Sequence, residues 1–355
     1  MATNTMQLEI TKISQSRINE VDWVNLPFGK VFSDHMLVMD YDNETWKKPS
    51  IQPFQNISLT PATSVLHYGQ TVFEGMKAYR NKEGEVSLFR AIENAKRFNQ
   101  SAERMCMPTI PTDLFINYVK ELVSIDRNWI PTEEGHSLYI RPFMIATDPY
   151  VGIRPSSSYK FMIFTCPVGK YYSEPVSVKI ETEYTRAAHG GTGYAKAGGN
   201  YAASLYPAKL AQEQGYQQLI WTDAKEHKYI EEAGTMNVIF QIGNKIITPK
   251  SSDTILDGIT RKSVMEIAKD WGYETEERKI TVEEVISAIK NGELKEAFGA
   301  GTAATIAPIK IINFEGVDYD IPTGKDDLFS TKVLDYLNQY KLGSVEDKFN
   351  WILKF

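Results

Sequence analysis

Short apolar runs alternate with amphipathic stretches along the first half of the chain. Residues 31–41, 85–89 and 137–146 are rich in β-branched, aromatic and other apolar residues, which is typical of strands. Residues 91–105 and 113–125 instead carry apolar residues every three to four positions, as on one face of an amphipathic helix. This half therefore predicts mixed α and β structure.

The composition changes after a further strand predicted at residues 159–166. Residues 167–175 begin and end with proline and contain a glycine, which is typical of a connecting segment. A chain of 355 residues also exceeds what one hydrophobic core usually supports. We therefore expect an interdomain linker at residues 167–175, between a small N-terminal domain over residues 1–166 and a large domain over residues 176–355.

The second half continues the mixture of α and β structure. Its apolar runs predict strands at residues 176–180, 216–222, 238–241 and 245–248. The last two strands are separated by a segment containing Gly243, which favours a hairpin.

Helices are predicted between these strands from their start and stop signals. One helix should follow Gly199, with a kink at Pro207 because proline disrupts a helix interior. Another should occupy residues 261–271, ending before a glycine. Thr281 and Glu284 have the spacing of a capping box, which predicts the start of a third helix.

Bulk composition narrows the class of function. The formal net charge of -6, with no block of lysine and arginine, argues against a nucleic-acid partner and favours a protein that acts on small molecules. Two distant cysteines, Cys106 and Cys166, give neither a disulfide framework nor the spacing of metal ligands. Residues 1–16 lack a signal or transit pattern, and no long apolar run predicts a membrane span. We expect a cytoplasmic protein without a metal site.

Lys196 stands among small residues just before a predicted helix. Small neighbours leave room for a bulky partner, and a lysine in such a place can form a Schiff base with an aldehyde cofactor. Taken alone, the pattern also suits a solvated loop lysine. A phosphate-binding loop is a further reading, but the Gly-Lys-Ser/Thr ending is absent.

Three other segments contain groups that could serve such a cofactor. Glu231 and Glu232 end a strand-like run, and a carboxylate facing a pyridine nitrogen keeps that nitrogen protonated. Residues 256–261 open a helix and residues 298–303 form a glycine-rich turn, so both could present backbone N–H groups to an anion. Each segment could equally be an ordinary strand end or loop.

Together these segments, in this order, make the chain resemble the branched-chain aminotransferase family of fold type IV pyridoxal-phosphate enzymes. The resemblance extends from residue 28 to about residue 310. Its most specific parts are Phe-Glu-Gly-Met-Lys-Ala at 73–78, Lys-Ala-Gly-Gly-Asn-Tyr at 196–201 and Glu-Ala-Gly-Thr-Met-Asn at 232–237. It implies two domains, a smaller N-terminal α/β domain and a larger C-terminal pseudo-barrel domain.

The resemblance also implies pyridoxal 5′-phosphate as the cofactor. Lys196 matches the catalytic lysine that forms the Schiff base, Glu232 the carboxylate at the ring nitrogen, and Tyr201 the tyrosine at O3′. The full set of cofactor-binding residues that it implies is Lys196, Arg90, Tyr201, Glu232, Thr235, Ile259, Thr260 and Thr302.

Substrate recognition and assembly follow from the same resemblance. Tyr139 and Arg141, with the turn at Thr302 and Ala303, match the residues that recognise the substrate carboxylate. The full set of substrate-binding residues that it implies is Phe32, Tyr68, Tyr139, Arg141, Ile153, Thr302 and Ala303. Tyr68 and Ile153 match positions that the family supplies across a dimer interface, so an active homodimer is expected.

The implied reaction transfers the amino group of leucine, isoleucine or valine to 2-oxoglutarate. Lys196 would move a proton from Cα of the substrate to the cofactor. Some family members carry a Cys-x-x-Cys pair after the Gly-Thr-Ala turn, whereas this chain has residues 304–307 as Ala-Thr-Ile-Ala, which excludes thiol redox control there. The alternatives are another fold type IV enzyme, such as a D-amino acid aminotransferase or aminodeoxychorismate lyase, and a noncatalytic metabolite-binding protein.

Overall fold

The computed structural model describes residues 7–172 and 174–355, so residues 1–6 and Ser173, which falls in the expected linker, lie outside the described residues. The chain divides into two compact units. The first contains the chain up to Tyr171 together with Ala195–Gly198 and Gln339–Phe355, and the second contains Tyr172–Tyr194 and Gly199–Asn338. The expected domain of residues 176–355 differs from this division, because two later segments group with the first unit.

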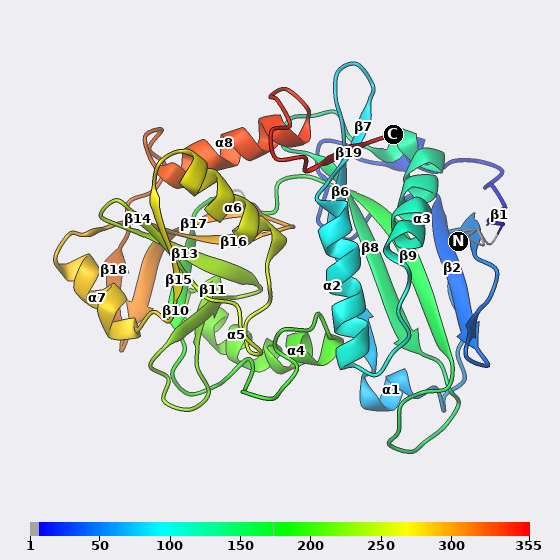
Figure 1. Cartoon of the computed structure of the whole chain (residues 1–355), viewed down its shortest axis with the longest axis horizontal. Coiled ribbons are helices and arrows are strands. Elements are labelled where there is room, and N and C mark those ends of the chain that lie inside the picture. Colours follow the sequence, from blue (N-terminus) through cyan, green and yellow to red (C-terminus); the bar gives the residue numbers. More distant parts are fainter. Residues whose placement is uncertain (1–6, 173) are drawn as a thin grey trace. The chain divides into compact units, whose positions relative to one another are not determined.

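The first unit is built on a ten-stranded sheet with the order β1-β4-β2-β9-β8-β6-β7-β19, in which β3 pairs with β2 and β5 with β8 (Figure 1). Its strands are β1 (Glu9–Ile10), β2 (His35–Asp42), β3 (Thr45–Trp46), β4 (Ser50–Pro53), β5 (Thr71–Phe73), β6 (Met76–Arg80), β7 (Val86–Phe89), β8 (Ser137–Ala146), β9 (Tyr159–Val168) and β19 (Ile352–Lys354). The pairing of β19 with β7 explains why the end of the chain belongs to this unit.

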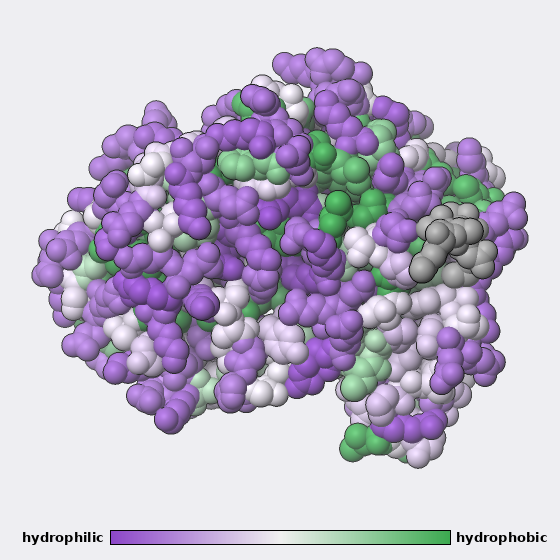
Figure 2. Space-filling view, in the orientation of Figure 1, coloured by the Kyte–Doolittle hydropathy of each residue, from purple (hydrophilic) through white to green (hydrophobic). Residues whose placement is uncertain are grey.

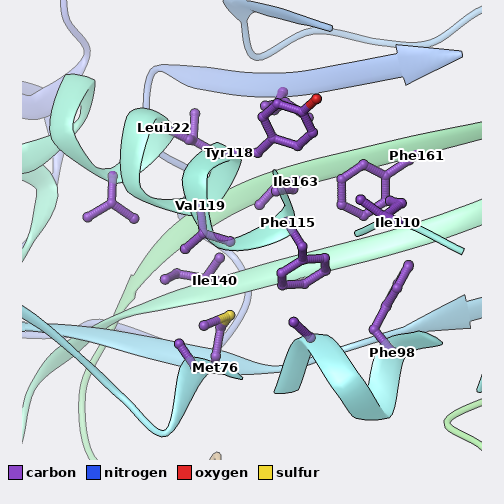
Figure 3. Packing of buried hydrophobic residues seen from close by; sticks show 14 of the residues in the cluster. Met76, Phe98, Ile110, Phe115, Tyr118, Val119, Leu122, Ile140, Phe161 and Ile163 are labelled. Atoms are coloured by element: carbon purple, nitrogen blue, oxygen red, sulfur yellow. The ribbon is translucent and has the colours of Figure 1, made fainter. Parts of the chain in front are cut away.

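Helices α2 (Ala91–Arg104) and α3 (Thr112–Ile125) cover this sheet, and α1 (Val65–Tyr68) is a single turn. Short 3-10 helices occur at Ile18–Glu20 and Arg127–Trp129. Phe115 of α3 packs against Phe98 of α2 and Phe161 of β9, with ring centroids 5.4 and 5.8 Å away, and Tyr118 of α3 belongs to the same buried cluster (Figure 3). Each such side chain contributes about 1.5–3 kcal/mol when fully buried, so this core fixes α2 and α3 against the sheet.

The second unit contains a sheet that closes on itself. Its order is β12-β11-β10-β17-β16-β13-β14-β15, and β12 also pairs with β13, which completes a ring of six strands. The strands are β10 (Val176–Ile180), β11 (Gln218–Thr222), β12 (Ile230–Ala233), β13 (Met236–Ile242), β14 (Lys245–Pro249), β15 (Glu274–Arg278), β16 (Leu294–Gly301), β17 (Thr305–Phe314) and β18 (Val317–Asp320). The predicted hairpin is confirmed as β13 and β14.

The helices of this part of the chain are α4 (Gly198–Ala203), α5 (Leu205–Glu213), α6 (Ile259–Asp270), α7 (Val282–Lys290) and α8 (Phe329–Lys341). The predicted cap of α7 is confirmed, because the Glu284 N–H donates to Thr281 Oγ1 at 3.0 Å. The single kinked helix predicted after Gly199 is wrong. Two helices separate at Ser204, which places Pro207 in the first turn of α5, where its missing N–H is tolerated.

The strand predicted at residues 31–41 is also wrong at its start, since β2 begins at His35. Asp34 instead accepts hydrogen bonds from the Ser16 hydroxyl, the Arg17 N–H and the Trp129 indole. Side-chain hydrogen bonds to Asp34 therefore anchor the chain before β2, together with main-chain bonds from the Ser33 N–H to the Thr165 carbonyl and from the Phe54 N–H to the Asp34 carbonyl.

Within the described residues, no helix is long and apolar enough to cross a membrane, and no group of metal-binding side chains occurs. Cys106 and Cys166 are both free thiols. Hydrophilic residues cover most of the face drawn in Figure 2, with smaller clusters of hydrophobic atoms between them.

Candidate active site

Lys196 lies in a short segment that extends the edge of β5 in the first unit. The Phe73 N–H donates to the Lys196 carbonyl at 3.0 Å, and Val72 and Ala197 form an isolated antiparallel bridge. A side chain at Gly198 would meet Thr71 Cγ2 at 2.7 Å, so glycine permits this close approach. The segment therefore has a defined path on both sides of the lysine.

The Lys196 amine and the Arg141 guanidinium both lie near the ring of Phe73. Its Nζ is 4.9 Å from the centroid of the Phe73 ring, and the guanidinium carbon of Arg141 is 4.7 Å from the same centroid. Cations are attracted to the face of an aromatic ring. Phe73, the first residue of the motif at 73–78, thus lies near two predicted site residues, although the sequence analysis gives it no role of its own.

Tyr139 and Arg141 lie on one face of β8, as alternate residues of a strand do. Arg141 Nη2 donates to the Tyr139 hydroxyl at 3.0 Å. A Cβ at Gly75 would lie 2.2 Å from that hydroxyl, so only glycine fits there. The structure therefore brings Lys196, Tyr139 and Arg141 together around Phe73, with a phenol and a guanidinium suited to binding a carboxylate.

The other predicted residues of the first unit lie in different settings. Phe32 stacks on Phe54 with centroids 4.9 Å apart and packs near Tyr139. Tyr68 of α1 and Ile153 of the β8–β9 connection are exposed, Ile153 at 93%. The structure does not bring these two residues to Lys196 within the unit.

Arg90 has an unusual backbone at the start of α2. Its φ is 49°, a left-handed conformation that non-glycine residues rarely adopt and that is found preferentially at functional sites. Its N–H donates to the Trp351 carbonyl at 2.7 Å, and its guanidinium carbon is 4.7 Å from the Trp351 ring centroid. The end of the chain therefore helps to hold Arg90.

Glu232 is the centre of a buried polar cluster in the second unit. Arg186 Nη2 lies 2.6 Å from Glu232 Oε2, with side-chain exposures of 9% and 4%. Asn237 Nδ2 donates to Glu232 Oε1 at 3.1 Å and to the Leu256 carbonyl at 2.9 Å. Both carboxylate oxygens are thus held in place. Sequence reasoning missed Arg186, and it included Asn237 only as the last residue of the motif at 232–237, without a role.

Glu231, the neighbour of Glu232, has a different environment. Its Oε1 accepts from Thr254 Oγ1 at 2.6 Å, whereas its buried Oε2 has no hydrogen-bond partner among the described residues. Burial raises the pKa of the Glu231 carboxyl above its ordinary value, against the lowering effect of Thr254 and Arg186. The two adjacent glutamates therefore differ in what holds them.

The amino end of α6 offers backbone donors. Gly258, the residue before the helix, makes no side-chain cap, and the first N–H groups of a helix have no partner inside it. Ile259 and Thr260 occupy these first positions of a helix of twelve residues and are buried. Such a terminus favours an anion.

The remaining predicted residues of this part lie in or next to turns. Thr235 is exposed in the turn between β12 and β13, and Thr302 and Ala303 are half-buried in the turn between β16 and β17. Tyr201 is half-buried in α4. The second unit therefore combines a clamped carboxylate with a helix terminus suited to a phosphate.

Comparison with known proteins gives a consistent result. Residues 71–312 match the model of the family described as amino-transferase class IV. The chain is 46% identical to branched-chain-amino-acid aminotransferase 2 of Bacillus subtilis (strain 168), over 99% of this chain and 97% of that protein.

Solved structures give the same picture. The branched-chain aminotransferase of Thermoproteus uzoniensis with norvaline has a TM-score of 0.75 and 27% identity, over 90% of this chain and 99% of that one. The branched-chain amino acid aminotransferase from Escherichia coli has a TM-score of 0.72 and 25% identity, over 90% of this chain and 98% of that one. These likenesses confirm the fold class predicted from the sequence.

Proposed function

The chain belongs to the amino-transferase class IV family, and from this premise we propose that it transfers the amino group of leucine, isoleucine or valine to 2-oxoglutarate with pyridoxal 5′-phosphate. The observation that carries the proposal is the placement of Lys196, whose amine lies beside the Phe73 ring on a main chain fixed on both sides. An amine in such a place can act as nucleophile and base.

The described residues fit this cofactor by their chemistry. Glu232 is a buried carboxylate held on both oxygens, which suits it to keep a proton on a pyridine nitrogen. The N–H groups of Ile259 and Thr260 at the start of α6 suit a phosphate. The residues that would complete the binding of the cofactor are Arg90, Tyr201, Thr235 and Thr302.

When bound, pyridoxal phosphate supplies an aldehyde that condenses with amines and a ring that stabilises negative charge at Cα. The Lys196 amine holds the cofactor between turnovers. Once free, the same amine would act as the base that takes the Cα proton of the substrate and as the acid that returns it. Glu232 maintains the proton on the ring nitrogen, and Arg186 and Asn237 keep that carboxylate oriented.

The substrate is held by its two ends. Tyr139 and Arg141 bind the carboxylate, together with the turn at Thr302 and Ala303. Phe32 contributes to an apolar pocket for the side chain. An apolar pocket separates substrates that differ by one methylene by only about 1–3 kcal/mol, so all three branched-chain amino acids should react.

We further propose that the active form is a homodimer in the cytoplasm, in which Tyr68 and Ile153 of one protomer complete the pocket of its partner. Support comes from the apolar side chains that α1 and the β8–β9 connection expose: Leu66, Tyr68, Tyr150, Val151 and Ile153. Contiguous exposed apolar residues mark interaction surfaces.

Replacing Ile153 by Asp should weaken the dimer at least tenfold, or about 1.4 kcal/mol, because a charge would be buried at the interface. Light scattering over a range of protein concentrations would measure the change. Val24→Asp is the control, since Val24 is also an exposed apolar residue of the first unit, at 86%. A wild-type protein that is monomeric at all concentrations would contradict the proposal.

The function itself is tested by the absorbance of the protein with pyridoxal phosphate, before and after L-leucine is added without an acceptor. We expect the band of the lysine-bound cofactor to disappear and 4-methyl-2-oxopentanoate to form, and Lys196→Ala to abolish both the band and turnover. Reaction with D-amino acids alone would indicate another fold type IV enzyme. Cofactor binding with no oxo acid from any amino acid would indicate a noncatalytic protein.

A further inference from the structure

Ser101 of α2 contacts the main chain of the proposed cofactor lysine. The Lys196 N–H donates to Ser101 Oγ at 2.9 Å, and the Ser101 hydroxyl donates to the Arg97 carbonyl at 2.9 Å. Ser101 is fully buried, so water does not compete for these bonds. We propose that Ser101 is a positioning residue that fixes the main chain from which the Lys196 amine extends.

The two peptide groups that flank Lys196 are held by different elements. Ser101 of α2 binds the N–H side, and Phe73 of β5 binds the carbonyl side. Loss of the Ser101 bond alone would leave the carbonyl bond and the bridge between Val72 and Ala197 in place. The segment would then stay folded while the base of the lysine side chain gained freedom. A misplacement of about 1 Å can lower a rate about 100-fold.

The two elements that hold Lys196 are themselves joined by a buried ion pair. Glu74 follows Phe73 directly, and Arg97 lies one turn before Ser101 on the same face of α2. Arg97 Nε and Nη2 donate to the two oxygens of Glu74 at 2.7 and 3.0 Å. The Phe73 and Ser101 contacts to Lys196 therefore belong to one rigid frame.

The position of Ser101 matters to catalysis only if Lys196 carries the cofactor, so this inference rests on the proposed function. The contact itself can be tested without that function. Hydrogen–deuterium exchange of the Lys196 amide, measured on the full chain without cofactor, reports directly on the bond to Ser101.

The decisive variant is Ser101→Ala, compared with Ser87→Ala. Ser87 is another buried serine of the first unit, and its hydroxyl donates to a main-chain carbonyl, that of Lys341, at 2.7 Å. We expect Ser101→Ala to speed exchange of the Lys196 amide about fivefold, as loss of one hydrogen bond predicts. With cofactor, kcat should fall about tenfold with little change in KM for L-leucine. Ser87→Ala should change neither quantity.

Ser101→Thr keeps the hydroxyl and provides a second test. It should retain slow exchange of the Lys196 amide if the added methyl group leaves the melting temperature unchanged. Wild-type exchange and kcat in Ser101→Ala would overturn the inference, as would fast exchange in a stable Ser101→Thr. If Lys196→Ala instead kept the absorbance band of the lysine-bound cofactor, the proposed function would be wrong. The exchange rate of the Lys196 amide in Ser101→Ala would still show whether the hydrogen bond to Ser101 exists.

Discussion

Each unit contains a buried pair of a glutamate and an arginine, and these two pairs differ in how completely they are satisfied. Glu74 and Arg97 of the first unit make two parallel hydrogen bonds, and Glu74 also accepts from the Asn94 amide at 2.8 Å and the Gly75 N–H at 3.0 Å. Although burial opposes ionisation, Arg97 and then Lys196 and Asn94 hold the pKa of Glu74 below its ordinary value.

The pair of the second unit is less complete. Arg186 uses Nη2 for Glu232 and for the carbonyls of Gly193 and Thr254, whereas its buried Nε has no hydrogen-bond partner among the described residues. Unsatisfied buried groups are uncommon and often indicate a functional site or a bound molecule. The two pairs are therefore alike in burial and differ in the completeness of their hydrogen bonding.

The largest expected effect is a loss of stability when the Glu74–Arg97 pair is broken. Glu74→Ala leaves the Arg97 charge buried without its carboxylate, and removal of one partner of a buried pair costs about 3–5 kcal/mol. Urea unfolding would measure this loss. The double variant Glu74→Leu with Arg97→Met should recover most of it, because apolar residues of similar volume can replace a buried pair. If Glu74→Ala were as stable as the wild type, Glu74 would not contribute to the stability of the first unit.

The next largest expected effect is a loss of activity when Glu232 of the second pair is changed. Glu232→Gln cannot keep a ring nitrogen protonated, so we expect kcat for L-leucine to fall about 100- to 1000-fold while the protein stays folded. Glu231→Gln is the matched control, since it makes the same chemical change one residue away and should leave kcat within about twofold. If kcat fell equally in Glu232→Gln and Glu231→Gln, the loss would reflect a general effect of changing this strand and not a specific role of Glu232.

The sequence predicted those parts of the fold whose signals are local. The strands β8 and β10 occupy the predicted residues, and the cap of α7 forms as its spacing indicates, because each depends on neighbours in the chain. The start of β2 was predicted too early because Asp34 is held by residues distant in sequence. No local pattern reveals such contacts.

The same limit applies to the candidate site. The motifs predict Lys196, Glu232 and Arg141, and also Tyr139, which accepts a hydrogen bond from Arg141, but they do not predict Arg186 or Ser101. Arg186 is 46 positions before Glu232, and nothing in its own neighbourhood distinguishes it from a surface arginine. Ser101 could have been noticed as part of a polar stripe in α2, although its contact with Lys196 is visible only in three dimensions.

The smallest expected effect concerns Glu231 and pH. Because burial raises its pKa in the folded chain, Glu231 keeps its proton to a higher pH when folded than when unfolded. Its contribution to stability is therefore present below the ordinary pKa of a glutamate and is lost as pH rises through the raised value. Glu231→Gln cannot ionise, so the free energy of unfolding of the wild type, minus that of the variant, should decrease from about pH 4 to about pH 8.

Asp223→Asn provides a control of opposite sign. Burial would raise the pKa of Asp223, but the backbone N–H groups of Tyr229, Glu226, Lys228 and Lys225 outweigh it and hold the pKa below its ordinary value. Its contribution is fully present above the ordinary pKa of an aspartate, about 3.9, and is lost only as pH falls below that value, so its difference should stay flat between about pH 5 and pH 8 and decrease at more acid pH. Unfolding in urea at each pH would give both differences, in which the other carboxyls largely cancel. If the difference between the wild type and Glu231→Gln did not change with pH across this range, Glu231 would have the same pKa in the folded and the unfolded chain. Its environment would then not oppose ionisation.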